Sequence, residues 1–204
     1  MKIIGICGSS GSGKSTVCSI LAGRGVPVLD CDVIYHELVD HPSHCLHAIA
    51  ERFGNSMIRD GKLDRAALRK VVFSDPAALN DLNRISHYYV KEELRDRCRK
   101  LKENGEEVVA IDAPMLFEAN LETWCDVVCA VVADPLVQIR RICARDGITP
   151  EDARLRVLKQ TPSEILRERA DFILENNGSA EELSDACDRL LEYTRSTERK
   201  KRHE

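Results

Sequence analysis

The octapeptide Gly8-Ser9-Ser10-Gly11-Ser12-Gly13-Lys14-Ser15 constrains the fold more than any other stretch of the chain. It matches the phosphate-loop pattern G-x-x-x-x-G-K-[ST] at every fixed position. The apolar run Ile3–Cys7 before it predicts a buried strand, and the segment after it predicts a helix with Val17, Ile20 and Leu21 on one face. Strand, loop and helix in this order are the context in which the motif binds phosphate, so a Gly/Ser-rich turn without a ligand is the weaker interpretation.

Small loop residues allow successive backbone N–H groups to point inward at a helix N-terminus, where they form a nest for an anion. We expect the Lys14 ammonium to reach the β- and γ-phosphates and the Ser15 hydroxyl to ligate Mg²⁺. The chain is therefore predicted to bind a nucleoside triphosphate, ATP, together with Mg²⁺. The nucleotide-binding residues predicted from the loop are Gly11, Ser12, Gly13, Lys14, Ser15 and Thr16.

Length and charge limit the classes of protein to consider. The 204 residues suffice for one α/β core with an added subdomain, and 43% hydrophobic with 31% charged residues is an ordinary globular balance. A formal net charge of −4 provides no global basic field for nucleic acid or a membrane surface. The one basic cluster, Arg199–Arg202, is more simply interpreted as a solvated tail than as a nucleic-acid patch. No signal peptide or long apolar span is evident, so we expect a cytoplasmic protein. We also expect it to be monomeric or weakly self-associating.

Two sets of residues could suggest metal or disulfide chemistry. The chain has nine cysteines, an odd number, and no C-x-x-C pair, which favours buried thiols in a reducing cytosol over a disulfide framework or a zinc site. His41, His44 and His47 lie three residues apart beside Cys45. At this spacing the outer histidines diverge around a helix, and no carboxylate completes the set, so a polar helix face is preferred to a metal site.

Aspartates follow two predicted strands at the edge where ligands of an open parallel sheet lie. Asp30 and Asp32 come after the predicted strand Val26–Leu29, and either could cap a helix over Val33–Val39. Spacing alone weighs a catalytic role and a capping role about equally. The run Val108–Asp112 resembles a Walker B strand, whose carboxylate would face the metal held by Ser15, although strands often end in Asp as a cap.

Residues 41–105 change the pattern from alternating strands and helices to successive helices with no convincing strand. We expect helices over His44–Phe53 and Leu63–Phe73, a third opened by Asp75-Pro76, and a long segment over His87–Glu103. A helical block between two strands of a parallel sheet is a natural position for a substrate-binding insertion.

The part after the predicted fourth strand, Asp126–Ala133, contains an arginine-bearing helix. Arg141 and Arg145 lie at i, i+4 on one face, and two further helices begin at Thr149-Pro150 and Thr161-Pro162. This arrangement favours a lid whose cations cover a transferring phosphoryl group. The alternative is a solvated helix whose arginines pair with nearby acidic residues, namely Asp146, Glu151 and Asp152.

The last part of the chain completes the sheet. Phe172–Leu174 predicts the fifth strand and Asn176–Gly178 the loop at its tip. Ser179 and Glu182 form a capping box for a final helix with an apolar stripe.

Several spaced signatures together make the chain resemble the dephospho-CoA kinase family from Ile3 to about Leu191. They are the loop through Lys14-Ser15-Thr16, Leu29–Asp32, Asp60–Arg65 with Val72-Phe73, Leu82–His87, Asp112–Glu118, Gln138, Arg141, Arg145, Gln160, Ala170-Asp171 and Asn176–Gly178. The chain departs from the family pattern at Cys7, Ser9, Cys31 and Tyr88, none of which removes a charged group.

The resemblance implies transfer of the ATP γ-phosphate to the ribose 3′-hydroxyl of dephospho-CoA. It implies a P-loop NTPase-type α/β fold with a parallel five-stranded sheet flanked by helices. The expected core comprises 1–40, 106–136 and 166–204, the helical CoA-substrate insertion 41–105 and the lid 137–165. It also implies roles for individual residues: Asp32 orients or deprotonates the hydroxyl, Asp112 serves the metal or the acceptor, Arg141 and Arg145 contact phosphates, Asn176 lies near adenine, and Arg65, His87, Leu116 and Phe117 line the CoA side.

Three other functions remain to be weighed against this interpretation. A kinase of the same architecture could act on a nucleoside or nucleoside monophosphate. A GTP-dependent switch would require an N-K-x-D element, which the sequence does not contain. A non-catalytic ATP-binding module would be expected to lose Lys14, Asp112 or the arginines, and all are present.

Overall fold

The computed structural model describes residues 1–198, so the predicted basic tail at Arg199–Arg202 lies outside the described residues. The chain divides into two compact units. One consists of Met1–Leu29 and Asn104–Glu204, and the other of Asp30–Glu103. The assignment of a core, a substrate insertion and a lid to particular residue ranges stays a prediction.

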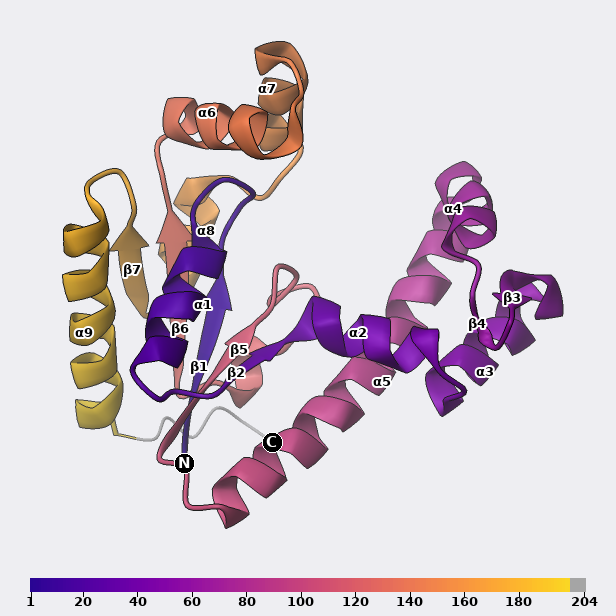
Figure 1. Cartoon of the computed structure of the whole chain (residues 1–204), viewed down its shortest axis with the longest axis horizontal. Helices are drawn as coiled ribbons and strands as arrows, with labels where there is room; N and C mark the ends of the chain where they lie inside the picture. The colour runs from indigo at the N-terminus through magenta and orange to yellow at the C-terminus, as the bar shows by residue number, and fades with distance from the viewer. Residues whose placement is uncertain (199–204) are drawn as a thin grey trace. The chain divides into compact units, whose positions relative to one another are not determined.

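A five-stranded sheet organises the first unit (Figure 1). Its strand order is β2-β5-β1-β6-β7, and β1 pairs in parallel with both β5 and β6, as β6 does with β7. The strands are β1 (Lys2–Cys7), β2 (Val28–Asp30), β5 (Val108–Asp112), β6 (Val127–Val132) and β7 (Phe172–Glu175). Every residue of β5 and β6 is buried, as expected for parallel strands covered on both faces. The predicted α/β fold with a five-stranded parallel sheet is confirmed.

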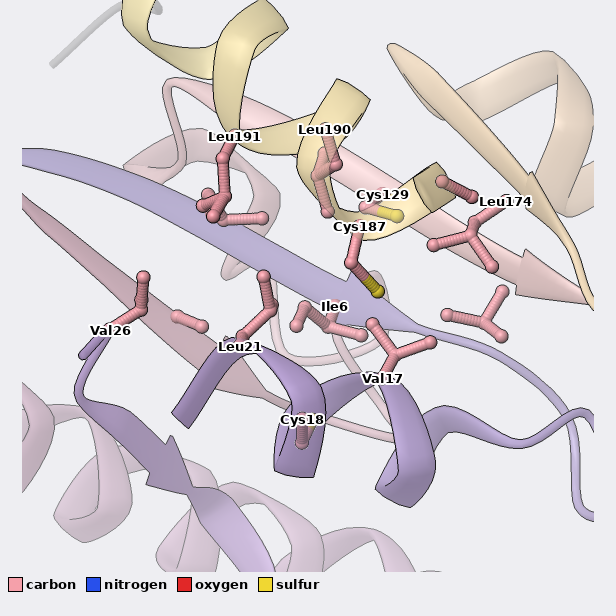
Figure 2. Close-up of a cluster of buried hydrophobic side chains, with 14 of the residues drawn as sticks. Ile6, Val17, Cys18, Leu21, Val26, Cys129, Leu174, Cys187, Leu190 and Leu191 are labelled. Atoms are coloured by element: carbon pink, nitrogen blue, oxygen red, sulfur yellow. The ribbon is translucent and has the colours of Figure 1, made fainter. Parts of the chain in front are cut away.

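Two helices from opposite ends of the chain pack together against this sheet. They are α1 (Lys14–Gly23) and α9 (Ala180–Ser196), which contact each other and share one hydrophobic core. Figure 2 shows Val17 and Leu21 of α1 and Leu190 of α9 among the side chains of this cluster. The predicted capping box opens α9, with Ser179 and Glu182 each satisfying the other's backbone N–H.

Three helices follow β6 before the chain returns to the sheet at β7. They are α6 (Pro135–Asp146), α7 (Pro150–Leu158) and α8 (Ser163–Arg169), and a short 3₁₀ turn, η2 (Glu122–Trp124), precedes β6. Proline in the first turn of α6 and α7 agrees with the fixed backbone angle that suits this position. The two helices α6 and α7 pack on each other at the top of Figure 1.

The second unit has a hydrophobic core of its own, to which α2, α3, α4 and α5 contribute. Its elements are α2 (Cys31–Asp40), α3 (His44–Phe53), η1 (Asn55–Met57), β3 (Ile58–Arg59), β4 (Lys62–Leu63), α4 (Arg65–Ser74) and α5 (Pro76–Glu103). The predicted helix His44–Phe53 is confirmed at both ends.

Two predictions for this unit were wrong. A small antiparallel hairpin, β3–β4, lies where only helices were expected, with the turn Asp60-Gly61 between its strands. The third and fourth predicted helices form one 28-residue helix, α5. The apolar residues Ala78, Leu82, Ile85 and Tyr89 recur at helical spacing across the boundary that was expected and pack on the core of this unit.

No helix within residues 1–198 has the length and apolar character needed to cross a bilayer.

The position of the hydrophobic core predicts that two leucines contribute differently to the free energy of unfolding. Leu21 is 0% exposed, whereas Leu136 at the start of α6 is 75% exposed. We expect Leu21→Ala to lower the free energy of unfolding by about 2–5 kcal/mol, because it removes buried methyl groups and leaves a cavity. The matched Leu136→Ala should change it by no more than about 0.5 kcal/mol. Urea unfolding followed by circular dichroism measures both, and equal losses would contradict this assignment of the core.

Candidate functional site

The phosphate loop requires glycine at the point where it enters α1. Gly13 has a φ of 95°, in the left-handed region, and a Cβ there would collide with the Asn176 side chain. Gly11 has a φ of 79°, and a Cβ there would lie 2.7 Å from the backbone oxygen of Gln138. The N-cap residue of α1, Gly13, has no side chain with which to cap the first N–H groups of the helix. A helix N-terminus preceded by such a loop is suited to bind an anion.

Lys14, the first residue of α1, forms an ion pair with Asp112 at the end of β5. The Lys14 ammonium donates to Oδ1 of Asp112, and the Cys18 thiol donates to Oδ2 with an Sγ–O distance of 3.4 Å. Asp112 is only 5% exposed and Cys18 8%. The pairing holds a cation and a carboxylate beside the loop in a largely desolvated position, where electrostatic interactions are stronger than in water.

Arg141 and Asn176 together hold the loop through its carbonyl groups. The Arg141 guanidinium donates to the Gly11 and Ser12 oxygens at 3.3 and 3.4 Å and to Asn176 Oδ1 at 3.2 Å. The buried Asn176 amide donates to the Ser12 oxygen at 2.8 Å. These bonds fix the Gly11 and Ser12 carbonyl groups to donors from outside the loop.

The segment between α6 and α8 contacts the loop tip at three more points. Arg145 donates to the Ser10 hydroxyl at 3.1 Å, and the Ser10 N–H donates to Gln160 Oε1 at 2.6 Å. The Ser9 hydroxyl donates to the Thr161 backbone oxygen at 3.3 Å. The predicted phosphate-contacting arginines, Arg141 and Arg145, are therefore both brought to the loop.

Asp146, the last residue of α6, is the centre of a small cluster of ion pairs. It forms ion pairs with Arg145 and Arg156, so the predicted pairing of Arg145 with a nearby acid occurs alongside its contact with the loop. Hydrogen bonding from Arg145, together with that from Arg156, lowers the pKa of the Asp146 carboxyl to about 2. At neutral pH this carboxylate is ionised and links α6 to α7.

Leu116 and Phe117, predicted to line the CoA side, are buried in the segment after β5. Leu116 is 0% and Phe117 8% exposed, and the Arg169 guanidinium lies 3.8 Å from the centre of the Phe117 ring. Arg169 also pairs with Glu122 at 3.3 Å. Both apolar side chains therefore pack within the unit, and their role toward a substrate stays a prediction.

The other predicted acceptor-side residues belong to the unit 30–103. Asp30 caps α2, since its carboxylate accepts from the N–H groups of Asp32 and Val33 at 2.8 and 3.0 Å. Asp32 is exposed in the first turn of the same helix. Arg65 opens α4 and pairs with Asp40 at 2.8 Å. Of the two aspartates weighed for catalysis, Asp30 thus has the capping role.

His87 lies half-buried on α5, in the same unit. Of the histidines considered for a metal, His47 lies 3.6 Å from Glu51, one turn along α3. Within residues 1–198 no group of three or more His, Cys, Asp or Glu side chains is arranged to hold a metal ion.

Sequence reasoning missed the Lys14–Asp112 ion pair, the bond from Asn176 to Ser12 and the contacts of Cys18 and Gln160. Cys18 reaches Asp112, and its position four residues after Lys14 on the same helix face was a signal that could have identified it. Gln160 binds Ser10 across 150 residues of sequence, a distance over which no local pattern indicates a partner. Cys7, beside the loop, is made unreactive by burial, which raises the pKa of its thiol to about 12.

Comparisons with known proteins are consistent from sequence to structure. A family model described as dephospho-CoA kinase matches residues 2–182. The chain is 38% identical to the dephospho-CoA kinase of Anaeromyxobacter dehalogenans, over 94% of this chain and 91% of that protein. The crystal structure of TT1252 from Thermus thermophilus is 35% identical with a TM-score of 0.78, over 94% of this chain and 96% of that one. The dephospho-CoA kinase of Campylobacter jejuni, 22% identical, shares the fold with a TM-score of 0.71 over 97% and 100% of the two chains.

Two neighbouring asparagines provide a matched test of the loop. Asn176 bonds to the loop at Ser12, whereas the Asn177 side chain bonds to Asp134 in another segment. We expect Asn176→Ala to weaken ATP binding about tenfold, because it removes a buried hydrogen bond and the support for Arg141. Asn177→Ala should leave ATP affinity within about twofold, since its bonds lie away from the loop. Calorimetric titration measures both, and equal affinities for the two variants would contradict the role of Asn176.

The charge cluster at Asp146 predicts a titration. Since the pKa is held at about 2, below the ordinary value, the ion pairs are complete above about pH 4 and are lost as the pH falls toward 2. Removing Arg145, the main cause, should raise the pKa more than removing Arg156. NMR titration of the Asp146 carboxyl carbon in Arg145→Gln and Arg156→Gln measures this, with Arg154→Gln on α7 as the unaffected control. An unchanged pKa in both variants would refute the assignment.

Proposed function

Because the chain belongs to the dephospho-CoA kinase family, we propose that it transfers the γ-phosphoryl group of ATP to the ribose 3′-hydroxyl of dephospho-CoA, giving CoA and ADP. The observation that carries the proposal is the convergence on one phosphate loop of Lys14, paired with Asp112, and of Arg141 and Arg145 from α6. Cations around a phosphate loop match the negative charge of a transferring phosphoryl group.

The proposed work of the site is positioning and charge stabilisation. Phosphoryl transfer passes through a loose transition state with negative charge on the equatorial oxygens, and few covalent steps are required of the protein. In this proposal the loop N–H groups and Lys14 hold the β- and γ-phosphates. Arg141 and Arg145 neutralise charge from the lid side, and lid closure excludes the water that would otherwise hydrolyse ATP.

The donor set at the loop fits a magnesium ion. Mg²⁺ prefers oxygen ligands and is usually bound by one or two protein groups together with phosphates and water. Ser15 is exposed at the start of α1, and a carboxylate such as Asp112 can accept further bonds beside those from Lys14 and Cys18. Ser15 and Asp112 would hold the ion, directly or through water. When bound, Mg²⁺ offsets charge on the β- and γ-phosphates.

The residues proposed to bind the acceptor, dephospho-CoA, include side chains of α2, α4 and α5. Asp32 orients the 3′-hydroxyl or takes its proton, and Arg65 and His87 contact dephospho-CoA. Support for Asp32 over Asp30 comes from the cap: Asp30 is engaged by two backbone N–H groups, and Asp32 is the exposed aspartate of the pair. Leu116 and Phe117 shape the CoA side from within the fold, and Asn176 lies near the adenine of ATP.

We propose that the reaction takes place in the cytoplasm with small molecules as the only substrates, by a monomer or a weak homo-oligomer. All nine cysteines lie within residues 1–198 and none of them forms a disulfide, which suits a reducing compartment.

An ADP-release assay tests the proposed function. Purified protein with ATP and Mg²⁺ should form ADP with dephospho-CoA as acceptor and not with AMP, CMP or adenosine. ADP formed with a nucleotide acceptor instead would transfer the assignment to a nucleotide kinase of the same architecture. No ADP with any acceptor would favour a binding module.

The same assay compares the contributions of Lys14 and Asp32 to kcat/KM. We expect Lys14→Ala to lower kcat/KM by about 10³-fold, because it removes a cation aimed at the developing charge. Asp32→Asn should cost less, about 10- to 100-fold, since the hydroxyl proton leaves late in a loose transition state. Lys102→Ala, at an exposed lysine on α5, is the control and should be neutral. Comparable losses for the first two variants would overturn the ranking.

A further inference from the structure

We propose that Cys18 is a positioning residue of this site. Its thiol donates to Oδ2 of Asp112 and so fixes the carboxylate whose other oxygen holds the Lys14 ammonium. The inference rests on the proposed function insofar as Lys14 contacts the phosphates of ATP. It adds to the site a residue that touches neither substrate nor nucleotide.

The geometry of α1 supports this role. Lys14 and Cys18 are four residues apart, so their side chains lie on the same helix face, one turn from each other. Both reach Asp112, which ends β5 opposite Ile6 of β1. The two donors thus come from one rigid helix and take different oxygens of one carboxylate.

Two hydrogen bonds, one to each oxygen, fix the orientation of the Asp112 carboxylate, whereas a single bond does not. A carboxylate held by an ammonium alone can rotate about its Cβ–Cγ bond and exchange oxygens, because the ammonium is a compact charge without a preferred plane. A second donor on Oδ2 sets the carboxylate plane and, with it, the direction in which Lys14 is held. Small displacements of groups around a reacting phosphate are costly, since the rate depends on geometry.

Burial increases the consequence of losing the thiol. Asp112 and Cys18 are 5% and 8% exposed, so the bond to Oδ2 lies away from bulk solvent. A buried acceptor that loses a donor is more costly than an exposed one, because water does not readily replace the bond. A thiol is a weak donor, so we expect its loss to have a smaller effect on kcat/KM than the loss of a stronger donor to a charged group.

The first test compares three variants at Cys18 and Cys187. We expect Cys18→Ala to lower kcat/KM for ATP about fivefold to tenfold. Cys18→Ser, which keeps a donor, should retain activity within about threefold of the parent. Cys187→Ala is the matched control, because Cys187 is buried in the same hydrophobic core but lies on α9 rather than on the helix that carries Lys14. It should lower the melting temperature about as much as Cys18→Ala while leaving kcat/KM within about twofold.

The second test is a double-mutant cycle with Asp112→Asn. An asparagine there would turn its carbonyl oxygen to Lys14 and its NH₂ group to Cys18, because the lysine ammonium is a donor only. The thiol then faces an NH₂ donor, so the bond that it makes to Oδ2 of Asp112 in the parent is lost. We therefore expect Cys18→Ala to change kcat/KM by less than about twofold in the Asp112→Asn background, although it costs more in the parent.

Several outcomes would overturn the proposal. One is a double variant whose loss of kcat/KM is the product of the losses from Cys18→Ala and Asp112→Asn. The others are a loss of kcat/KM from Cys187→Ala equal to that from Cys18→Ala, or a Cys18→Ser variant as impaired as Cys18→Ala. The same cycle is measured with ATP affinity by calorimetry, which requires no acceptor. If the parent protein forms no ADP with dephospho-CoA, the proposed function fails, and the affinity cycle still decides the role of Cys18.

Discussion

The parallel register between β1 and β5 is the constraint on which the site depends. Ile6 lies opposite Asp112, and the phosphate loop begins two residues after Ile6. Because the carboxyl ends of parallel strands meet at one edge of a sheet, Asp112 is carried to the position where Lys14 opens α1. A slip of one residue would turn the Asp112 side chain to the other face of the sheet and separate the pair. The buried apolar residues of both strands thus fix a charged contact that they do not themselves make.

A second constraint acts on the loop from outside. Arg141 and Asn176 bond to its carbonyl groups, and Gln160 accepts from the N–H of Ser10 at its tip. These residues come from α6, the end of β7 and the turn before α8, so the loop shape depends on elements distant in sequence. Preorganised dipoles stabilise charge without reorganising during the reaction, and a loop held at several points supplies them. The contacts from the predicted lid mean that lid and loop conformations are linked.

Local sequence patterns predicted the secondary structure better than the contacts. The strands, the helix His44–Phe53 and the capping box of α9 follow from residues a few positions apart, and the family inferred from the spaced motifs is confirmed. The helix Pro76–Glu103 was divided in two although Ala78, Leu82, Ile85 and Tyr89 continue one apolar face across the division. The sequence predicted Asp112 near the phosphate loop but not its ion pair with Lys14, because the carboxylate was expected to face a metal at Ser15. The contact of Gln160 with Ser10 could not be predicted, because tertiary packing alone brings the two residues together.

The ion pair between Lys14 and Asp112 is best understood as a functional rather than a stabilising interaction. Taking two charges out of water costs several kcal/mol for each ion, and the mutual attraction often does no more than offset that cost. An apolar pair of similar volume would serve folding as well at this position between α1 and β5. The chain instead keeps a partly buried cation beside the phosphate loop, and a thiol donates to its partner carboxylate. The cost to stability is reasonable where the cation must already be in place when a phosphate arrives, because a fixed charge acts on the transition state without further reorganisation.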